Sequence, residues 1–203
     1  MADGKKRHFK SAPSLQLITG DCYAEIIRGV KNGEQTAASK FYSIFGSKIN
    51  GLVWKLLGAD QEHDDVVNQV FVNILDSLES LKDTRKLEAW VVGVTVNTIR
   101  RELRSRKIRR LIHLLPDTED LLKGNDDCSK EEIVRSFYQV MDRMRPEERL
   151  AFGLYYVEGY NIEEVAYYLD RSLGTVKRRL KRARTLFIKY ALPNPAIAAL
   201  AEK

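Results

Sequence analysis

Two blocks of basic side chains are the most chemically specific feature of this 203-residue sequence, whose formal net charge is +6. Residues 99–113 carry seven basic side chains and one acid, and residues 171–189 carry eight basic side chains and no acid. Between them, residues 114–132 carry seven acids and two lysines. Because clustered Lys and Arg side chains attract phosphate groups, this pattern predicts two surfaces for a polyanion, joined by a linker. A pair of solvated helix faces is the alternative interpretation.

The second basic block lies in a pattern that predicts a helix-turn-helix over residues 161–187. Asn161 with Glu164 three residues later is typical of a capped helix start, and residues 170–172 supply a short turn. The next helix has an apolar stripe and an opposite basic face, whose first turns would enter the major groove of DNA. Its later basic side chains would contact phosphates. A cationic surface helix without a fixed partner is the alternative. The side chains predicted to contact DNA here are Arg171, Ser172, Thr175, Lys177, Arg178, Lys181, Arg182 and Arg184.

Apolar side chains recur at three- and four-residue spacing along most of the chain, which is the period of a helix with one buried face. The difficult segment is 87–112, where Val91 to Val96 has strand propensity but fits two adjoining helical stripes and is followed by no turn signal. We therefore predict one long helix there, buried early and basic late. A further helix is predicted to open at Pro146 and to run to Gly159.

The predicted fold is all-α, with two small helical domains joined by an acidic flexible linker, the C-terminal one a helix-turn-helix. The predicted divisions are a flexible basic arm (1–22), a helical domain (23–113), the linker (114–130), the helix-turn-helix domain (131–190) and a C-terminal tail (191–203).

The composition and the short motifs argue against several classes of protein. No run of apolar residues approaches the roughly 18 that a membrane span needs, and no apolar stretch of signal-peptide length follows the basic N-terminus. Cys22 and Cys128 lack metal-ligand neighbours, so we expect a reduced, cytoplasmic protein. His63 and the two acids after it lack a second ligand group, and no phosphate loop or nucleophile motif is present. We expect no metal, no cofactor and no enzymatic activity.

The segment Ser172 to Arg184, read as SLGTVKRRLKRAR, resembles the C-terminal signature of the extracytoplasmic-function group of sigma-70-type RNA polymerase sigma factors. Upstream, residues 145–149 and 158–166 are similar to the preceding segments of the same domain. In the N-terminal half, residues 64–71 resemble the helix that grips the polymerase clamp, and residues 88–91 with Asn97 resemble the next helix. The resemblance spans about residues 23–190 and equates 23–113 with sigma region 2 and 131–190 with sigma region 4.

The resemblance implies that the chain binds core RNA polymerase, at the β′ clamp and the β flap, and directs it to specific promoters. The acids at the start of the 64–71 helix would pair with basic residues of a β′ coiled coil, and helix capping by these acids is the plain alternative. An anti-sigma factor is a further candidate partner, and no membrane insertion is expected. The residues implied in binding the polymerase are Asp64, Asp65, Val66, Gln69, Val70 and Phe71.

The resemblance also implies two separate readings of promoter DNA. The helix-turn-helix would read the minus-thirty-five element as duplex, and the N-terminal domain would capture the minus-ten element as a melted non-template strand. A stand-alone helix-turn-helix regulator is the alternative function. The residues implied at the minus-ten element are Lys82, Arg85, Lys86, Asn97, Arg100, Arg104 and Lys107.

The sequence departs from the family pattern at three places. Many relatives have Trp or Phe where Ile74 or Leu75 stands, Asp where Arg101 stands and Gly where Asp170 stands. The first two departures concern promoter melting, and the third concerns the turn before the recognition helix.

Overall fold

The computed structural model describes residues 20–58, 61–112 and 129–201, and every regular element in those ranges is helical. The predicted all-α fold is therefore confirmed. Residues 1–19 of the predicted basic arm and nearly all of the predicted linker lie outside the described residues, and the last three residues of that arm belong to the first helix.

The N-terminal domain is built around α4, the long helix that the sequence predicts. Val91, Val92 and Val96 are buried on it, because helical spacing turns all three toward the other helices. The hydroxyl of the buried Thr95 donates a 2.8 Å hydrogen bond to the Val91 carbonyl, which satisfies that polar group within the helix. The helices of this domain are α1 (Gly20–Lys31), α2 (Gln35–Leu57), α3 (His63–Ser77) and α4 (Leu87–Ile112), with single 3-10 turns at η1 (Leu78–Ser80) and η2 (Thr84–Lys86).

The C-terminal domain packs its helices around α8, whose stripe of Val176, Leu180, Ala183 and Phe187 is buried as the sequence predicts. The helix that opens at Pro146 does not run on as a regular α-helix, because its second half has the wider π spacing. The elements of this domain are α5 (Lys130–Asp142), α6 (Pro146–Phe152), the π segment η4 (Gly153–Val157), α7 (Ile162–Leu169), α8 (Leu173–Ala191) and α9 (Ala198–Ala201). Thus α5 begins at the last residue of the predicted linker.

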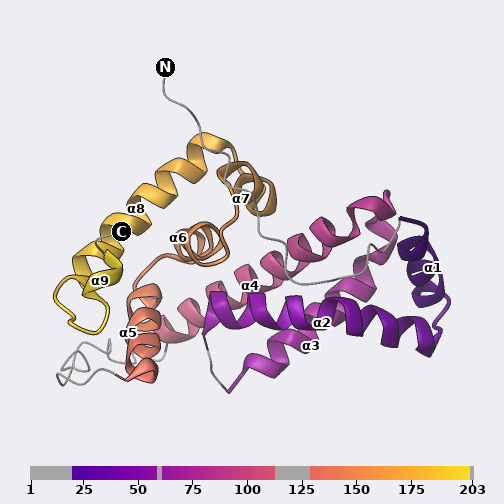
Figure 1. Cartoon of the computed structure of the whole chain (residues 1–203), viewed down its shortest axis with the longest axis horizontal. Coiled ribbons are helices and arrows are strands. Elements are labelled where there is room, and N and C mark those ends of the chain that lie inside the picture. The colour runs from indigo at the N-terminus through magenta and orange to yellow at the C-terminus, as the bar shows by residue number, and fades with distance from the viewer. Residues whose placement is uncertain (1–19, 59–60, 113–128, 202–203) are drawn as a thin grey trace.

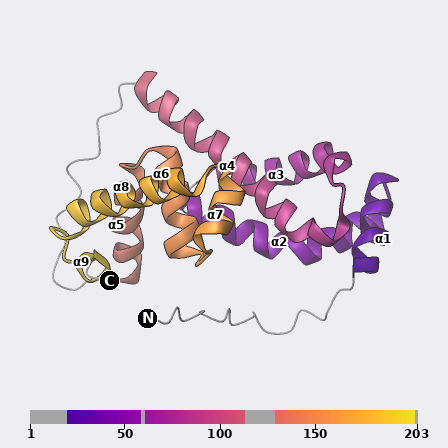
Figure 2. The same cartoon turned by 90° about the horizontal axis from the view of Figure 1, so that it is seen from above.

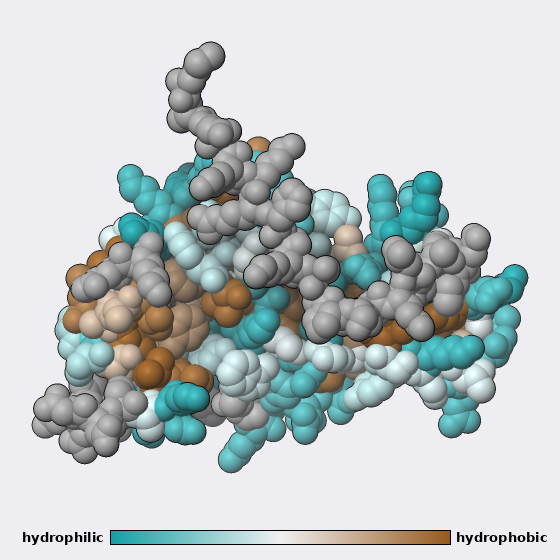
Figure 3. Space-filling model, in the orientation of Figure 1, coloured by the Kyte–Doolittle hydropathy of each residue, from teal (hydrophilic) through white to brown (hydrophobic). Residues whose placement is uncertain are grey.

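The predicted C-terminal tail contributes to the core. Ile197 is fully buried beside Phe187, and Asn194 is buried with its side-chain oxygen accepting a hydrogen bond from the Ala196 amide at 3.0 Å. Figure 3 shows hydrophobic side chains gathered at this end of the molecule, where Leu192 and Leu200 are exposed.

The helix-turn-helix begins with the cap that the sequence predicts at Asn161, and its second helix has a further cap at Ser172. The Asn161 side chain accepts from the Glu164 amide and the Glu164 carboxylate accepts from the Asn161 amide, both at 2.8 Å, which is a complete capping box. Asp170 then turns the chain with a left-handed φ of 50°, a conformation that Asp tolerates better than most residues. The Ser172 hydroxyl accepts from the Thr175 amide at 3.3 Å and caps α8.

The two domains are packed against one another. Figures 1 and 2 both show α6 and α7 lying against α4, and one hydrophobic core runs from α1 through α4 into α6, α7 and α8. The sequence predicts two bodies whose relative placement a flexible linker leaves open. The structure instead joins them through a shared core, with Leu150, Leu154 and Leu169 buried among the side chains of α2 and α4.

A buried arginine fixes this packing. The Arg149 guanidinium on α6 donates to the carbonyls of Leu56 and Leu57, at 2.9 and 2.8 Å, and forms an ion pair with Asp142. The two carbonyls belong to the last turn of α2, where no backbone donor remains for them. Burial lowers the pKa of Arg149, and the neighbouring Asp142 carboxylate opposes that shift.

Tyr138 on α5 closes the same end of α2. Its hydroxyl donates to the carbonyls of Trp54 and Lys55, at 3.0 and 3.3 Å, and burial raises its pKa to about 12. Together, Arg149 and Tyr138 dock the C-terminal domain on the carbonyl end of α2.

We expect Asn161→Ala to lower the free energy of unfolding by about 1 kcal/mol, because the Glu164 amide loses its acceptor. Asn161→Asp keeps an acceptor oxygen and should retain most of that stability. Urea unfolding followed by circular dichroism measures both variants. Equal losses in the two would contradict a capping role for this side chain.

Candidate nucleic-acid and polymerase interfaces

The recognition helix α8 separates its apolar and basic residues onto two faces. Five buried side chains anchor it to the domain, and most of the exposed side chains of the helix are basic. The structure therefore brings these predicted DNA-binding residues together on one exposed surface, as a helix inserted in a groove requires. The exposed basic residues of this face are Lys177, Arg178, Lys181, Arg182 and Arg184.

The start of α8 combines a capping role with exposure. Arg171 and Ser172 are exposed, and Thr175 is partly buried. The Ser172 and Thr175 hydroxyls lie 3.0 Å apart, and Arg171 donates to the Asp170 carbonyl at 2.6 Å. Arg179, which the sequence analysis left out of the DNA-binding set, instead pairs with Glu147 at 3.0 Å.

The predicted minus-ten loop forms the rim of a groove between the domains. Lys82, Arg85 and Lys86 are exposed on it. Arg85 pairs with Asp83 at 3.0 Å and thereby holds the pKa of that carboxyl below its usual value. A groove of about 430 Å³ has Arg85 and Lys86 on one side and the α7 residues Glu164 and Tyr168 on the other.

On α4 the predicted minus-ten residues divide into two groups. Asn97 and Lys107 are exposed. Arg100, whose side chain is only 12% exposed, donates to the Leu169 carbonyl at 3.0 Å and lies 3.7 Å from Glu147. Burial lowers the pKa of Arg100, and Glu147 opposes that shift. Arg104 binds the same carboxylate at 2.5 Å. Both arginines are thus engaged by the C-terminal domain.

The predicted polymerase surface on α3 has an acidic start. Asp64 and Asp65 are exposed in the first turn, where the helix dipole favours negative charge. The N-cap residue of this helix, Glu62, makes no side-chain cap hydrogen bond. Gln69 is exposed beside Asp64 and Asp65.

Only part of the predicted apolar set on α3 faces outward. Val66 and Val70 are buried in the core, so they position the helix in this structure. Phe71 is partly buried and packs against the exposed Tyr42 ring, with centroids 5.0 Å apart. The sequence analysis missed Tyr42 and also Val72, because neither interrupts the periodicity of its helix. Three exposed apolar side chains therefore accompany the acids: Tyr42, Val72 and Leu75.

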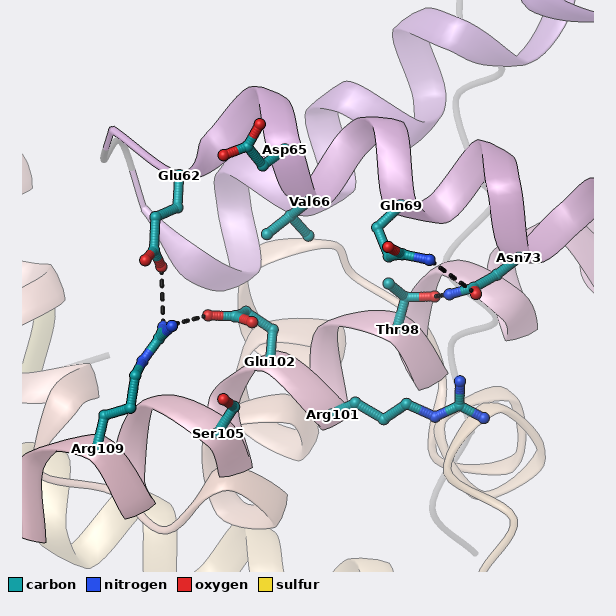
Figure 4. A pocket seen from close by; sticks show the side chains of 10 residues that line it. All are labelled: Glu62, Asp65, Val66, Gln69, Asn73, Thr98, Arg101, Glu102, Ser105 and Arg109. Carbon is teal, nitrogen blue, oxygen red and sulfur yellow. Dashed lines mark hydrogen bonds and ion pairs between the residues drawn. The ribbon is translucent and has the colours of Figure 1, made fainter. Parts of the chain in front are cut away.

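A polar cleft lies between α3 and α4, and Figure 4 shows its lining. Asn73 donates to the Thr98 hydroxyl at 2.8 Å, and Arg109 bridges Glu62 and Glu102 at 3.0 and 2.9 Å. Arg101, where relatives carry Asp, extends past the open end of the cleft.

The other positions at which the sequence departs from the family pattern are Ile74 with Leu75, and Asp170. Ile74 is buried, so Leu75, which is 54% exposed, is the member of that pair that a partner can reach. Asp170 adopts a left-handed backbone conformation, which Gly reaches without steric cost.

The described ranges contain neither a metal-binding cluster nor a membrane-spanning helix. No group of three or more His, Cys, Asp and Glu side chains there could hold a metal ion. None of the helices in those ranges is long and apolar enough to cross a bilayer.

Comparison with known proteins gives matches to both halves of the chain. Residues 41–109 match the family model of Sigma-70 region 2, and residues 135–186 match that of Sigma-70, region 4. The ECF RNA polymerase sigma factor SigW of Bacillus subtilis is 24% identical over 78% of this chain and 90% of its own length. The RNA polymerase sigma-H factor of Pseudomonas aeruginosa is 22% identical over 87% of this chain and 97% of its own.

Two solved structures share the fold, each with a TM-score of 0.55. One is CnrH in complex with the cytosolic domain of CnrY, 19% identical, with 88% of this chain and 96% of the other covered. The second is the sigma factor RpoE of Bartonella quintana in complex with the anti-sigma factor NepR, 16% identical, with 75% and 94% covered.

Proposed function

Since this chain belongs to the extracytoplasmic-function group of the sigma-70 family, we propose that its two domains divide the recognition of a promoter between them. The chain is a sigma factor, which binds core RNA polymerase and directs it to promoters to start transcription. A stand-alone helix-turn-helix regulator would not need the region 2 domain, which residues 41–109 match.

The C-terminal domain reads the minus-thirty-five element through α8. The observation that carries this proposal is the exposed cationic face of a capped helix whose other face is anchored in the core. Thr175 and Arg178 lie in the first two turns, within reach of base edges. Lys181, Arg182 and Arg184 lie further along, where a helix leaves the groove and meets phosphates.

The N-terminal domain captures the melted minus-ten strand. Lys82, Arg85 and Lys86 supply charge on the loop before α4, and Arg100 and Arg104 supply charge on α4 itself. Binding of a single strand needs a cationic track for the backbone as well as contacts to the bases, and these side chains line such a track from the loop onto the helix.

Polymerase docks on α3 and its neighbour α2. The exposed acids Asp64 and Asp65 would pair with basic residues of the β′ clamp, and the apolar surface of Tyr42, Val72 and Leu75 would be covered by it. Exposed apolar side chains grouped beside charged ones are typical of a protein–protein interface.

The proposed function also includes an anti-sigma partner and a place in the cytoplasm. CnrH is solved in complex with the cytosolic domain of CnrY, and RpoE is solved in complex with the anti-sigma factor NepR. By that likeness we include an anti-sigma factor among the partners of this chain. Transcription places the protein in the cytoplasm, and we assign it no catalysis of its own.

We expect Asp64→Arg combined with Asp65→Arg to weaken binding to core polymerase by tenfold or more, because two attractive charge pairs become repulsive. Glu25→Arg with Glu163→Arg makes the same change in net charge on exposed acids away from α3. Surface plasmon resonance with immobilised core enzyme measures both pairs of substitutions. Equal affinities for the two double variants would remove the acids from the interface.

We expect Arg178→Ala and Arg182→Ala to change promoter binding in different ways. The first should cost about 1–3 kcal/mol on the best promoter and relax the preference at one or two upstream positions. The second should weaken all promoters about equally and reduce the salt dependence by about one counterion. Holoenzyme binding to a library of upstream elements, repeated at several salt concentrations, separates these effects. A change of preference with Arg182→Ala alone would mean that α8 is placed differently in the groove.

A further inference from the structure

The first turn of the recognition helix carries an exposed apolar side chain among the basic ones. Leu173 is the first residue of α8 and is 43% exposed. It belongs to neither of the two hydrophobic cores, so it is not one of the side chains that anchor the helix, as Val176 and Leu180 are. A single exposed leucine is ordinary on a protein surface, but this one lies at the end of the helix that the proposed function places in the major groove.

The polar side chains beside Leu173 are engaged within the helix start. The Ser172 hydroxyl accepts from the Thr175 amide at 3.3 Å, and the two hydroxyls lie 3.0 Å apart. Arg171 donates to the Asp170 carbonyl at 2.6 Å. Part of the hydrogen-bonding capacity of these side chains is therefore used within the protein, whereas the Leu173 side chain faces solvent.

Gly174 leaves open space next to Leu173. A Cβ at position 174 would meet no atom of another side chain or element within 4 Å. Without a side chain there, the backbone of the first turn can approach the floor of a groove closely. The start of α8 thus presents the Leu173 side chain and bare backbone, and the exposed guanidinium of Arg178 follows just over one turn later.

An apolar side chain finds a matching group on only one of the four bases in the major groove. The C5-methyl of thymine is apolar, whereas the edges of adenine, guanine and cytosine present hydrogen-bond donors and acceptors alone. Leucine packed against those edges would bury polar atoms that lose their water partners, which costs affinity. The chemistry of this side chain therefore favours thymine.

We propose that Leu173 contacts the methyl group of a thymine in the minus-thirty-five element and so helps to determine which promoters the sigma factor selects. The inference rests on the proposed placement of α8 in the major groove. Leu173 and Arg178 are five residues apart in the helix, which is about 7.5 Å along its axis, and successive base pairs lie about 3.4 Å apart. The thymine is therefore within about two base pairs of the position that Arg178 reads.

Deoxyuridine tests the methyl group by itself, because it keeps the hydrogen-bonding groups of thymine and lacks only the C5-methyl. In the best upstream element from the promoter library, each thymine on either strand is replaced singly by deoxyuridine, and the affinity of the holoenzyme is measured for each duplex. We expect a loss of about fourfold at one thymine near the Arg178 position, as for one methyl-sized group left in water. No loss at any thymine there, or a best element without thymine there, would overturn the proposal.

Leu173→Ala assigns the methyl contact to this side chain. The substitution shortens an exposed side chain without changing charge, and circular dichroism with thermal melting establishes that the variant is folded. We expect about fourfold weaker binding to the parent element, and no further loss when deoxyuridine replaces that thymine. Leu192→Ala is the matched control, at a leucine of the same domain that is 52% exposed and lies beyond the end of α8. It should keep the full deoxyuridine effect. An equal deoxyuridine effect in Leu173→Ala and in the parent would overturn the assignment.

Arg178→Ala separates a wrong assignment of Leu173 from a failure of the proposed function. If Arg178→Ala relaxes the upstream preference while Leu173→Ala leaves the deoxyuridine effect in place, α8 lies in the groove and only the thymine contact is wrong. If neither variant changes the upstream preference, the placement of α8 itself is wrong. A deoxyuridine effect that Leu173→Ala abolishes, beside the position that Arg178→Ala relaxes, supports both.

Discussion

The packing of the whole molecule depends on the Arg149 guanidinium at the carbonyl end of α2. A buried cation is costly to remove from water, and it is stable only where its donors are all occupied in good geometry. Here the carbonyls of Leu56 and Leu57 and the carboxylate of Asp142 supply that environment, and the cation in turn satisfies a helix end that has no backbone donors left. Because neither group is satisfied without the other, this contact orients α6 against α2.

The orientation of α6 determines what meets α4. Helix α4 has an apolar N-terminal half that belongs to the core and a basic C-terminal half that extends from it, and α6 and α7 cross between the two. At that crossing the basic side chains need counter-charges, and Glu147 is the carboxylate within reach. The same positive charge that suits a phosphate backbone therefore also attracts an acid of the neighbouring domain. The proposed DNA contacts of Arg100 and Arg104 and their observed ion pairs with Glu147 therefore draw on the same positive charges.

The hydrophobic core shared by the two domains adds apolar burial to these ion pairs. Leu150, Leu154 and Leu169 are buried in the core that the two domains share, and apolar burial contributes roughly 25 cal/mol for each Å² removed from solvent. Close approach is needed as well, since Gly153 has no room for a Cβ against Leu56. Apolar burial, the capped carbonyls of α2 and the paired arginines of α4 therefore all depend on the same domain contact.

The sequence by itself determined the local structure and the class of the protein. The long helix 87–112, the capping box at Asn161 and the apolar stripe of α8 are all readable in it, because each depends on side chains within a few turns of one another. The basic face of the recognition helix is readable for the same reason. The tertiary structure alone decided which of these residues are available to a partner. Val66 and Val70 turn inward while Leu75 stays exposed, and the two carbonyls that accept from Arg149 lie more than ninety residues away. The bridge from Glu147 to arginines of both domains is likewise unreadable, since contacts between distant segments leave no periodicity in the chain and form only once the helices have packed.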